Sequence, residues 1–375
     1  MRVIIAAAGT GGHINPGIAI ANKIKEKEKN SEILFVGTLR GIENDLVPRA
    51  GYKLKTIEAY GFSKKLNINS IKNNIKTMKS TKSATKIIDE FKPDVVIGTG
   101  GYICGPVIMA AKKRNIPTFL HESNAAPGLA VKLLSKKVDE IFVGFKEAKE
   151  SLPKAKKVVV TGTPTKIKKQ NLTIDQIKEE KAKLGLNKDL PVLLVFGGSQ
   201  GAQKINNTII ELIEHKKPVD YQIMWATGQK NYDNIKEELK QKGLIVDNIK
   251  NVNIVPYIYN MEDTINCADL LVCRSGAITI VEIAKIGKPA IFIPLPNVSH
   301  NHQEKNARVL EKNNAAYVIL NDELTADKLS DTISGVITNK NKLHEMGLNA
   351  KKIDVEDVEE KIYREIKNTL NFIAK

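Results

Sequence analysis

The feature that most constrains this chain is a repeated order of a short apolar run, a glycine-rich turn and a helical pattern. The run Val3–Ala8 is followed by the turn Gly9–His13 and a predicted helix, and the same order restarts with Val192–Phe196 and the turn Gly197–Gly201. Non-alternating apolar runs separated by helices indicate parallel strands covered on both faces. A length of 375 residues is also enough for two domains. The sequence therefore predicts an α/β protein with two doubly wound parallel-sheet domains.

Further apolar runs continue each series, and a Gly-Thr-Pro turn at 162–164 separates them. We predict an N-terminal domain over 1–164 and a C-terminal domain over 165–354. The amphipathic segment 355–375 is predicted to form a terminal helix that packs back on the first domain. The predicted strands are 3–8, 33–37, 94–98, 118–121, 141–144 and 158–160 in the first series, and 192–196, 223–226, 252–255, 270–273 and 290–293 in the second.

Positive charge is concentrated in the first part of the chain. The formal net charge is +16, of which residues 1–160 carry +14. A lysine-rich composition alone would spread this charge evenly. The asymmetry indicates an anionic partner, either nucleic acid, an anionic membrane surface or a phosphorylated substrate.

The lengths of the apolar runs and the arrangement of the cysteines indicate the cellular compartment of the protein. The longest apolar run near the start has six residues, whereas a membrane span needs ~20 and a signal-peptide core ~7–15. Cys104, Cys267 and Cys273 form no C-x-x-C pair, which fits buried thiols in a reducing compartment. We expect a cytoplasmic location.

Both glycine turns are candidate phosphate sites. Glycines between a strand and a helix let backbone N–H groups approach phosphate oxygens, and the helix N-terminus adds partial positive charge. Ser199 adds a hydroxyl to the second turn, and His13 at the start of the first helix is a candidate general base. A plain tight turn is the alternative. Neither turn completes G-x-G-x-x-G or a P-loop, which argues against a dinucleotide-dependent oxidoreductase.

A third element follows the predicted strand 270–273. Thr279 and Glu282 lie three residues apart near the start of a predicted helix, where the carboxylate could bind ribose hydroxyls and the N–H groups of 277–279 a phosphate. A capping box formed by the same two residues is the alternative. His300 and His302 lack a third metal ligand nearby, so a polar loop over sugar hydroxyls is preferred to a metal site.

Taken together, these motifs resemble the MurG family of inverting glycosyltransferases, which transfer N-acetylglucosamine from its UDP donor to lipid I. The resemblance implies the GT-B fold, with two Rossmann-like domains and an interdomain cleft, and no obligatory metal or cofactor. It also implies lipid II as the product, for peptidoglycan synthesis. The matching stretches are Gly9–Gly17, Gly98–Pro106, His121–Asn124, Gly197–Gln203, Arg274–Ala284 and Asn301–Ala307.

The resemblance implies a donor site mainly in the C-terminal domain. Glu282 would bind ribose, the backbone of Ile258 would recognise uracil, and Gln303 would contact the sugar. The full donor set is Asn124, Lys166, Ser199, Ile258, Ala277, Ile278, Thr279, Glu282, His302 and Gln303.

The N-terminal domain would bind the acceptor. His13 is our first choice for the base that deprotonates the acceptor hydroxyl, and Glu122 is the alternative. The residues implied to hold the acceptor diphosphate are Thr10, Gly11, Gly12, Gly100, Gly101 and Tyr102.

Three positions depart from the family pattern. Thr163 stands where asparagine is common, Lys166 where arginine is usual, and Cys104 where a small residue, commonly serine, is found. Lysine cannot reproduce a bidentate guanidinium contact. These departures affect the donor contact of Lys166 and the local acceptor geometry, not the reaction class.

A lysine-rich stretch suggests how the protein meets a membrane. Seven lysines and no acidic residue lie between Gly61 and Lys86. A basic amphipathic helix binds well at an anionic surface, so we expect peripheral attachment to the cytoplasmic face of the cell membrane. An ordinary helix with its apolar side in the core is the alternative. The predicted membrane face is Ile68, Ile71, Lys72, Ile75, Lys76, Met78 and Lys79.

Other functions remain as alternatives at this point. A similar enzyme could transfer a sugar to diacylglycerol, or epimerise UDP-N-acetylglucosamine without any lipid. A basic nucleic-acid-binding protein is a remote alternative, because the few aromatic residues are scattered and no RNA-recognition or zinc motif occurs. The expected partners are UDP-N-acetylglucosamine, undecaprenyl-linked lipid I and an anionic membrane surface, and not nucleic acid.

Overall fold

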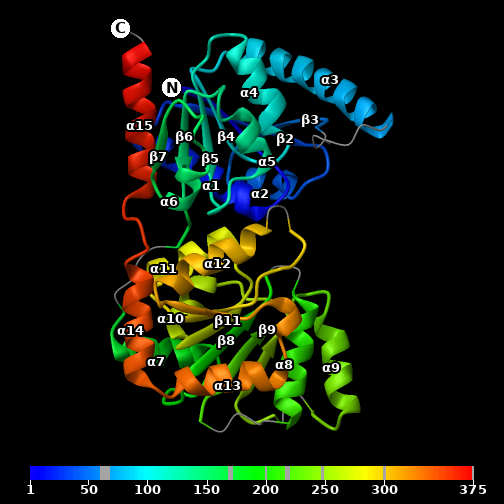
Figure 1. Cartoon of the computed structure of the whole chain (residues 1–375), viewed down its shortest axis with the longest axis vertical. Helices are drawn as coiled ribbons and strands as arrows, with labels where there is room; N and C mark the ends of the chain where they lie inside the picture. The colour runs from blue at the N-terminus through cyan, green and yellow to red at the C-terminus, as the bar shows by residue number, and fades with distance from the viewer. Residues whose placement is uncertain are drawn as a thin grey trace. The chain divides into compact units, whose positions relative to one another are not determined.

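The chain divides into two compact units, each built around a parallel β-sheet (Figure 1). The computed structural model describes residues 1–59, 68–167, 172–198, 201–215, 220–245, 249–298 and 301–373, with the backbone alone described for 68–78 and 373. The first unit comprises Met1–Lys166 and Val355–Lys375, and the second comprises Ile167–Asp354. The predicted α/β class with two doubly wound parallel sheets is confirmed.

The first unit holds a sheet whose seven described strands run in the order β3-β2-β1-β4-β5-β6-β7, all parallel. The strand order reverses between β1 and β4, which makes this edge of the sheet the expected ligand position. The strands are β1 Arg2–Ala7, β2 Glu32–Thr38, β3 Lys53–Ile57, β4 Val95–Gly100, β5 Thr118–Glu122, β6 Glu140–Val143 and β7 Val158–Val160. The helices are α1 Gly11–Lys27, α2 Glu43–Arg49, α3 Ile68–Phe91, α4 Cys104–Lys112, α5 Leu129–Leu134, α6 Lys146–Glu150 and α15 Val358–Ile373.

Both faces of this sheet are buried, as the non-alternating strands predict. Ile4 and Val96 pack on one face, whereas Ile5 and Ile97 pack on the other, and all four are fully buried. Two apolar layers on one sheet require helices on both sides. This packing fixes the carboxyl ends of β1 and β4 side by side.

The last helix, α15, belongs to the first unit although it comes from the far end of the chain (Figure 1). Ile362 and Ile366 are fully buried in the core beneath α1. Around this core, the Tyr363 hydroxyl and Lys367 Nζ each donate to Glu28 Oε1 at 3.0 Å. Apolar burial and these polar contacts together hold α15 against α1.

The second unit repeats the design with described strands in the order β10-β9-β8-β11-β12-β13, again all parallel. Here the order reverses between β8 and β11. The strands are β8 Val192–Phe196, β9 Gln222–Ala226, β10 Val252–Val255, β11 Leu270–Cys273, β12 Ala290–Phe292 and β13 Ala316–Val318. The helices are α7 Ile174–Lys183, α8 Gln203–His215, α9 Tyr232–Gln241, α10 Met261–Cys267, α11 Ala277–Ile286, α12 His302–Lys312, the 3₁₀ turn η3 Asn321–Glu323, α13 Ala326–Ile337 and α14 Lys340–Lys351.

Two strands were not predicted, and both lie at sheet edges. β3 has the alternating sequence KLKTI, in which Lys53 and Lys55 are exposed, and β13 has only three residues. Edge strands are short and partly polar, so they lack the continuous apolar run of a central strand. The sequence also predicts a first helix from Pro16 to Lys27, whereas α1 begins at Gly11, five residues earlier.

The long helix α3 is confirmed as a helix, but most of its predicted membrane face lies outside the described side chains. That holds for Ile68, Ile71, Lys72, Ile75, Lys76 and Met78. Farther along α3, Lys79 is exposed while Ala84, Ile87 and Ile88 are buried in the core. This part of the helix fits the ordinary core-packed alternative. In the described part of the chain, no helix is long and apolar enough to cross a membrane.

Candidate active site

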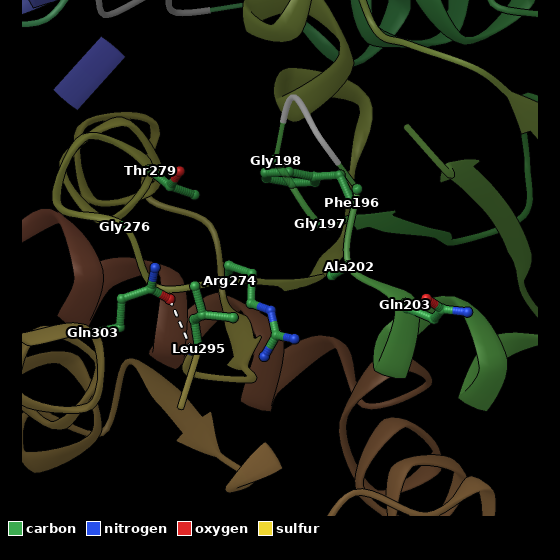
Figure 2. A pocket seen from close by; sticks show the side chains of 11 residues that line it. Phe196, Gly197, Gly198, Ala202, Gln203, Arg274, Gly276, Thr279, Leu295 and Gln303 are labelled. Atoms are coloured by element: carbon green, nitrogen blue, oxygen red, sulfur yellow. Dashed lines mark hydrogen bonds between the residues drawn. The ribbon is translucent and has the colours of Figure 1, made fainter. Parts of the chain in front are cut away.

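A pocket of about 350 Å³ lies in the second unit, where the strand order reverses (Figure 2). The turn after β8 forms one side, the turn after β11 leads into α11, and the start of α12 forms a third side. This is the position at which open α/β sheets bind ligands. The lining residues are Phe196, Gly197, Gly198, Gly201, Ala202, Gln203, Arg274, Gly276, Thr279, Leu295 and Gln303.

The N-terminus of α11 faces this pocket with no acidic residue in its first turn. Gly276 is the N-cap residue and forms no side-chain cap, so Thr279 lies inside the helix as its third residue. The capping box between Thr279 and Glu282 is therefore wrong. Three N–H groups of this first turn, at 277–279, have no acceptor within the helix, which suits an anionic ligand.

The Gln303 side chain is oriented by the backbone across the pocket. Its Oε1 accepts a hydrogen bond from the Leu295 N–H at 2.9 Å (Figure 2). Because the oxygen is occupied in this way, the amide NH₂ group is left to donate. Gln303 is therefore prepared to bind an acceptor oxygen, such as a sugar hydroxyl or a phosphate.

Two fully buried polar residues connect α11 and α12 and were not identified from the sequence. The Ser275 hydroxyl donates to the Gln303 carbonyl at 2.8 Å, and Asn306 Nδ2 donates to the Ser275 carbonyl at 3.3 Å. These hydrogen bonds fix the helix starts on either side of the pocket. No local sequence pattern marks such a long-range pair.

Arg274 was also missed as an individual site residue, although it begins one of the motif stretches. Its Nη1 lies 3.0 Å from the carbonyls of Ile293 and Pro294 and from Asn321 Oδ1. Its Nε is buried and has no partner among the described residues. Burial lowers the pKa of this guanidinium. Arg274 thus places a positive charge in the wall of the pocket. No carboxylate in the described chain forms an ion pair with it.

The other predicted donor residues differ in their relation to this pocket. Ala277 and Ile278 begin α11, Glu282 lies one turn farther along it, and His302 is the first residue of α12. Ile258 is buried between β10 and α10, outside the pocket lining. Asn124 and Lys166 belong to the first unit, and Ser199 lies outside the described residues.

In the first unit, His13 lies in the first turn of α1, beside the point where the strand order reverses. Its Nδ1 is 2.9 Å from the Ala8 carbonyl, which can only accept, so the neutral ring carries its hydrogen on Nδ1. Thr99 Oγ1 donates to the His13 carbonyl at 2.7 Å. Nε2 has no hydrogen-bond partner within the described chain and keeps its lone pair. This is the arrangement that a general base requires.

The second glycine loop of this unit packs closely against the first. A Cβ on Gly100 would overlap the His13 ring, and one on Gly101 would lie 2.6 Å from the Ala8 carbonyl oxygen. Both glycines have positive φ, at 136° and 85°. Tyr102 beside them is 62% exposed. The structure thus brings the predicted acceptor residues of the two loops together.

The first glycine turn offers several unused backbone donors. The N–H groups of Thr10, Gly11 and Gly12 find no acceptor among the residues that the structure describes. Thr10 is the N-cap, and Gly11 and Gly12 are the first two residues, of a helix of 17 residues with no acidic residue in its first turn. An oxyanion placed here would satisfy these donors.

Glu122 has a different environment from His13. It is 5% exposed, and its Oε1 accepts from the N–H and the Nδ2 of Asn124, both at 2.9 Å. Its Oε2 accepts from the Gly128 N–H at 2.7 Å. Both oxygens therefore hold the loop after β5. The neighbouring His121 is buried, and burial lowers its pKa to about 4.

The three departures from the family pattern occupy distinct positions. Cys104 is buried under the second glycine loop, where its Sγ lies 3.3 Å from the Gly100 N–H and burial raises its pKa to about 12. Thr163 is buried with no partner for its hydroxyl in the described chain, whereas Lys166 is exposed. Across the described ranges, no three His, Cys, Asp or Glu side chains are grouped as a metal site.

Two parallel-sheet units, each with a glycine turn and a helix N-terminus where the strand order reverses, define a protein of the GT-B fold class. Residues 3–143 match the Glycosyltransferase family 28 N-terminal domain, and residues 192–362 match the Glycosyltransferase family 28 C-terminal domain. Together with the sequence and structural similarities given in the next paragraph, these matches show that the chain belongs to the MurG family of glycosyltransferases.

The similarities extend over the whole chain. It is 47% identical, over 98% of its length and 100% of the relative, to a UDP-N-acetylglucosamine–N-acetylmuramyl-(pentapeptide) pyrophosphoryl-undecaprenol N-acetylglucosamine transferase of Thermoanaerobacter sp. (strain X514). The crystal structure of MurG from Acinetobacter baumannii matches with a TM-score of 0.77 and 27% identity, covering 98% of this chain and 99% of that one. A UDP-N-acetylglucosamine 2-epimerase from Neisseria meningitidis shares the fold, with a TM-score of 0.67 but 15% identity, covering 98% of this chain and 100% of that one. The fold alone does not separate transferase from epimerase, but the sequence identity favours the transferase.

Proposed function

We propose that this protein transfers N-acetylglucosamine from UDP-N-acetylglucosamine to the muramyl sugar of lipid I, which forms lipid II for peptidoglycan synthesis. The observation that carries this proposal is the identity to the Thermoanaerobacter transferase across both units. The transfer inverts the anomeric carbon in a single displacement. One base on the acceptor hydroxyl and charge stabilisation on the departing UDP are then sufficient.

The second unit binds the donor in this proposal. The first turn of α11 and Thr279 bind the diphosphate, and the Gln303 amide donates to the sugar. Charge that develops on the departing UDP is stabilised by backbone N–H groups and by the α11 N-terminus. Glu282 and the Ile258 backbone remain the proposed ribose and uracil contacts. Ser199, His302, Asn124 and Lys166 complete the proposed donor set.

The first unit binds the acceptor. The free N–H groups of Thr10, Gly11 and Gly12 receive the acceptor diphosphate, and Gly100, Gly101 and Tyr102 border it. These residues recognise an anion through the backbone, so the contact does not depend on a charged side chain.

His13 is the proposed catalytic base. Its Nε2 takes the proton from the acceptor hydroxyl as that oxygen forms the bond to the anomeric carbon, and the bond from that carbon to UDP breaks. The Nδ1 hydrogen bond to Ala8 holds the ring in the required tautomer. Glu122 is disfavoured as the base, because both of its oxygens already accept hydrogen bonds from the loop after β5.

Attachment to the cytoplasmic face of the membrane is part of the proposal. The charge concentrated in residues 1–160 and the exposed Lys79 support it. Co-sedimentation with anionic liposomes should fall when Lys72, Lys76 and Lys79 are replaced by glutamate. Unchanged co-sedimentation would remove this stretch from the membrane contact.

The deciding assay follows radiolabelled N-acetylglucosamine from its UDP donor into a short-chain lipid I analogue, with water and diacylglycerol as control acceptors. Label in the lipid I product alone is the expected outcome. Label in diacylglycerol would support the glycolipid alternative. Conversion of the donor to its epimer without any lipid would support the epimerase.

A further inference from the structure

A buried carboxylate supports the first glycine turn from behind. Glu43 is the first residue of α2 and is fully buried. Its Oε2 accepts from the Gly9 N–H at 3.1 Å, and its Oε1 accepts from the Thr38 N–H at 2.9 Å and the Thr38 hydroxyl at 2.5 Å. Gly9 follows β1 and Thr38 ends β2, the neighbouring strand. One side chain therefore joins the ends of two adjacent strands.

The surroundings of Glu43 are shaped to hold the carboxylate. A Cβ on Gly37 would lie 2.7 Å from Glu43 Cγ, and a Cβ on Gly41 would overlap the carboxylate itself. Asn44 Nδ2 closes the same loop by donating to the carbonyls of Thr38 at 3.0 Å and Gly41 at 2.9 Å. Glycine is thus required at two positions around one side chain.

The carboxylate also decides which donors of the turn remain open. The Gly9 N–H is used by Glu43, whereas those of Thr10, Gly11 and Gly12 are not used within the described chain. Burial alone would raise the pKa of Glu43, but hydrogen bonds from Thr38 and Gly9 lower it, so the group is ionised at neutral pH. An ionised carboxylate close to an anion site weakens anion binding by charge repulsion. Positioning of the turn is a gain that can offset this cost.

We propose that Glu43 is a positioning residue for acceptor binding, which fixes Gly9 so that the next three N–H groups converge on the acceptor diphosphate. The proposal rests on the proposed function of the first unit. Glu43 does not touch the acceptor itself. It acts through the backbone of the turn that precedes His13.

The test is steady-state transfer kinetics of Glu43→Gln with both substrates varied. In this variant the side-chain NH₂ group, which cannot accept a hydrogen bond, faces either the Gly9 N–H or the Thr38 donors. At least one of the hydrogen bonds made by Glu43 is therefore lost. We expect KM for the lipid I analogue to rise about tenfold or more. KM for UDP-N-acetylglucosamine and the affinity for UDP should stay within twofold, because every described residue that lines the pocket belongs to the second unit. The two proposed donor residues of the first unit, Asn124 and Lys166, lie outside the turn that Glu43 holds.

Glu140→Gln is the matched control. Glu140 is also a buried carboxylate of the first unit, at 1% exposed, but it begins β6 and so lies at the amino end of the parallel strands, whereas Thr38 and Gly9 lie at the carboxyl end. We expect this variant to lower thermal stability without changing KM for the acceptor. An equal rise in acceptor KM for both variants would mean that Glu43 acts only through general stability.

A second variant moves the carboxylate without removing it. In Gly41→Ala the new methyl group displaces Glu43, so the same rise in acceptor KM is expected. In a Glu43→Ala background the methyl group has space, and Gly41→Ala should then add little. Additive effects, unchanged acceptor KM in Glu43→Gln, or tighter acceptor binding in that variant would each overturn the proposal. Absence of transfer by the wild-type protein would instead refute the proposed function.

Discussion

The two units place a glycine turn at the same position of the same kind of sheet, but they hold it by different chemistry. In the first unit, a Cβ on Gly9 would meet nothing within 4 Å, and the turn is held by the Glu43 carboxylate. In the second unit, a Cβ on Gly201 would overlap the Thr227 carbonyl oxygen. That carbonyl also accepts from Asn206 Nδ2 at 3.0 Å and Asn231 Nδ2 at 3.1 Å.

The difference shows how one fold supports two tasks. The second turn is held by close backbone packing and neutral amides, which suits a site that only binds an anion. The first turn combines a buried carboxylate with an imidazole whose Nε2 is open. At the corresponding helix start in the second unit stands Gln203, which cannot act as a base. This difference supports the proposal that the catalytic base lies in the first unit.

The largest expected effect comes from removing the imidazole. We expect His13→Gln to lower kcat about 10³-fold, because general-base catalysis contributes ~10²–10⁴-fold. Affinity for UDP, measured by calorimetry, should not change. Gln203→Ala is the counterpart in the second unit, and its kcat should fall less than tenfold. Full activity of His13→Gln would remove this residue from the mechanism.

The packing of the two turns can be compared with one substitution in each. Gly201→Ala combines a positive φ of 75° with overlap onto backbone, so we expect a loss of about 3 kcal/mol in the free energy of unfolding. Gly9→Ala has a φ of 97° but open space, so about 1 kcal/mol is expected. Chemical denaturation of the full chain measures both. Equal losses would show that backbone conformation alone governs both turns.

Acid should destabilise the first unit at a higher pH than the second unit. The folded state holds the pKa of His121 at about 4, below the ordinary 6.5, so the unfolded state binds more protons between these values. Stability is therefore lost as the pH falls from 6.5 toward 4, by up to about 3 kcal/mol.

Hydrogen exchange across the first unit should report this loss. The only tryptophan, Trp225, is buried in the second unit, and its fluorescence should change later in the titration. His121→Gln should have a flatter pH dependence in this range. A pH dependence as steep as that of the wild type would assign the loss to other groups.

The smallest expected effect concerns two glutamines that line the same pocket. Gln303 has an oriented amide, whereas no hydrogen bond is found for the exposed Gln203 side chain in the described structure. Gln303→Glu should weaken binding of UDP-N-acetylglucosamine about tenfold more than binding of UDP, a difference of ~1.4 kcal/mol. Gln203→Glu adds the same charge and should weaken both ligands equally. Calorimetric titration with each ligand distinguishes these outcomes.

Much of the candidate site could be predicted because its backbone elements are local in sequence. The glycine turns, the start of α11 and the HESN loop were all located from short motifs. The residues that orient them could not be, since Ser275 and Asn306 are 31 positions apart, and Glu43 is 34 positions from Gly9. The capping box was predicted as an alternative from local spacing, but the N-cap of α11 is Gly276, three residues before Thr279.

The sequence by itself determined the two series of buried parallel strands, since central strands carry continuous apolar runs such as VIIAA and VLLVF. It also placed both glycine turns, because only glycine adopts positive φ at low cost. The tertiary structure decided the two unpredicted edge strands β3 and β13, the start of α1 at Gly11 and the orientation of the His13 ring. Each of these depends on a partner distant in sequence or on a backbone group whose position only packing determines. The open lone pair of His13 is the clearest case, because it follows from the Ala8 carbonyl at the end of a buried strand.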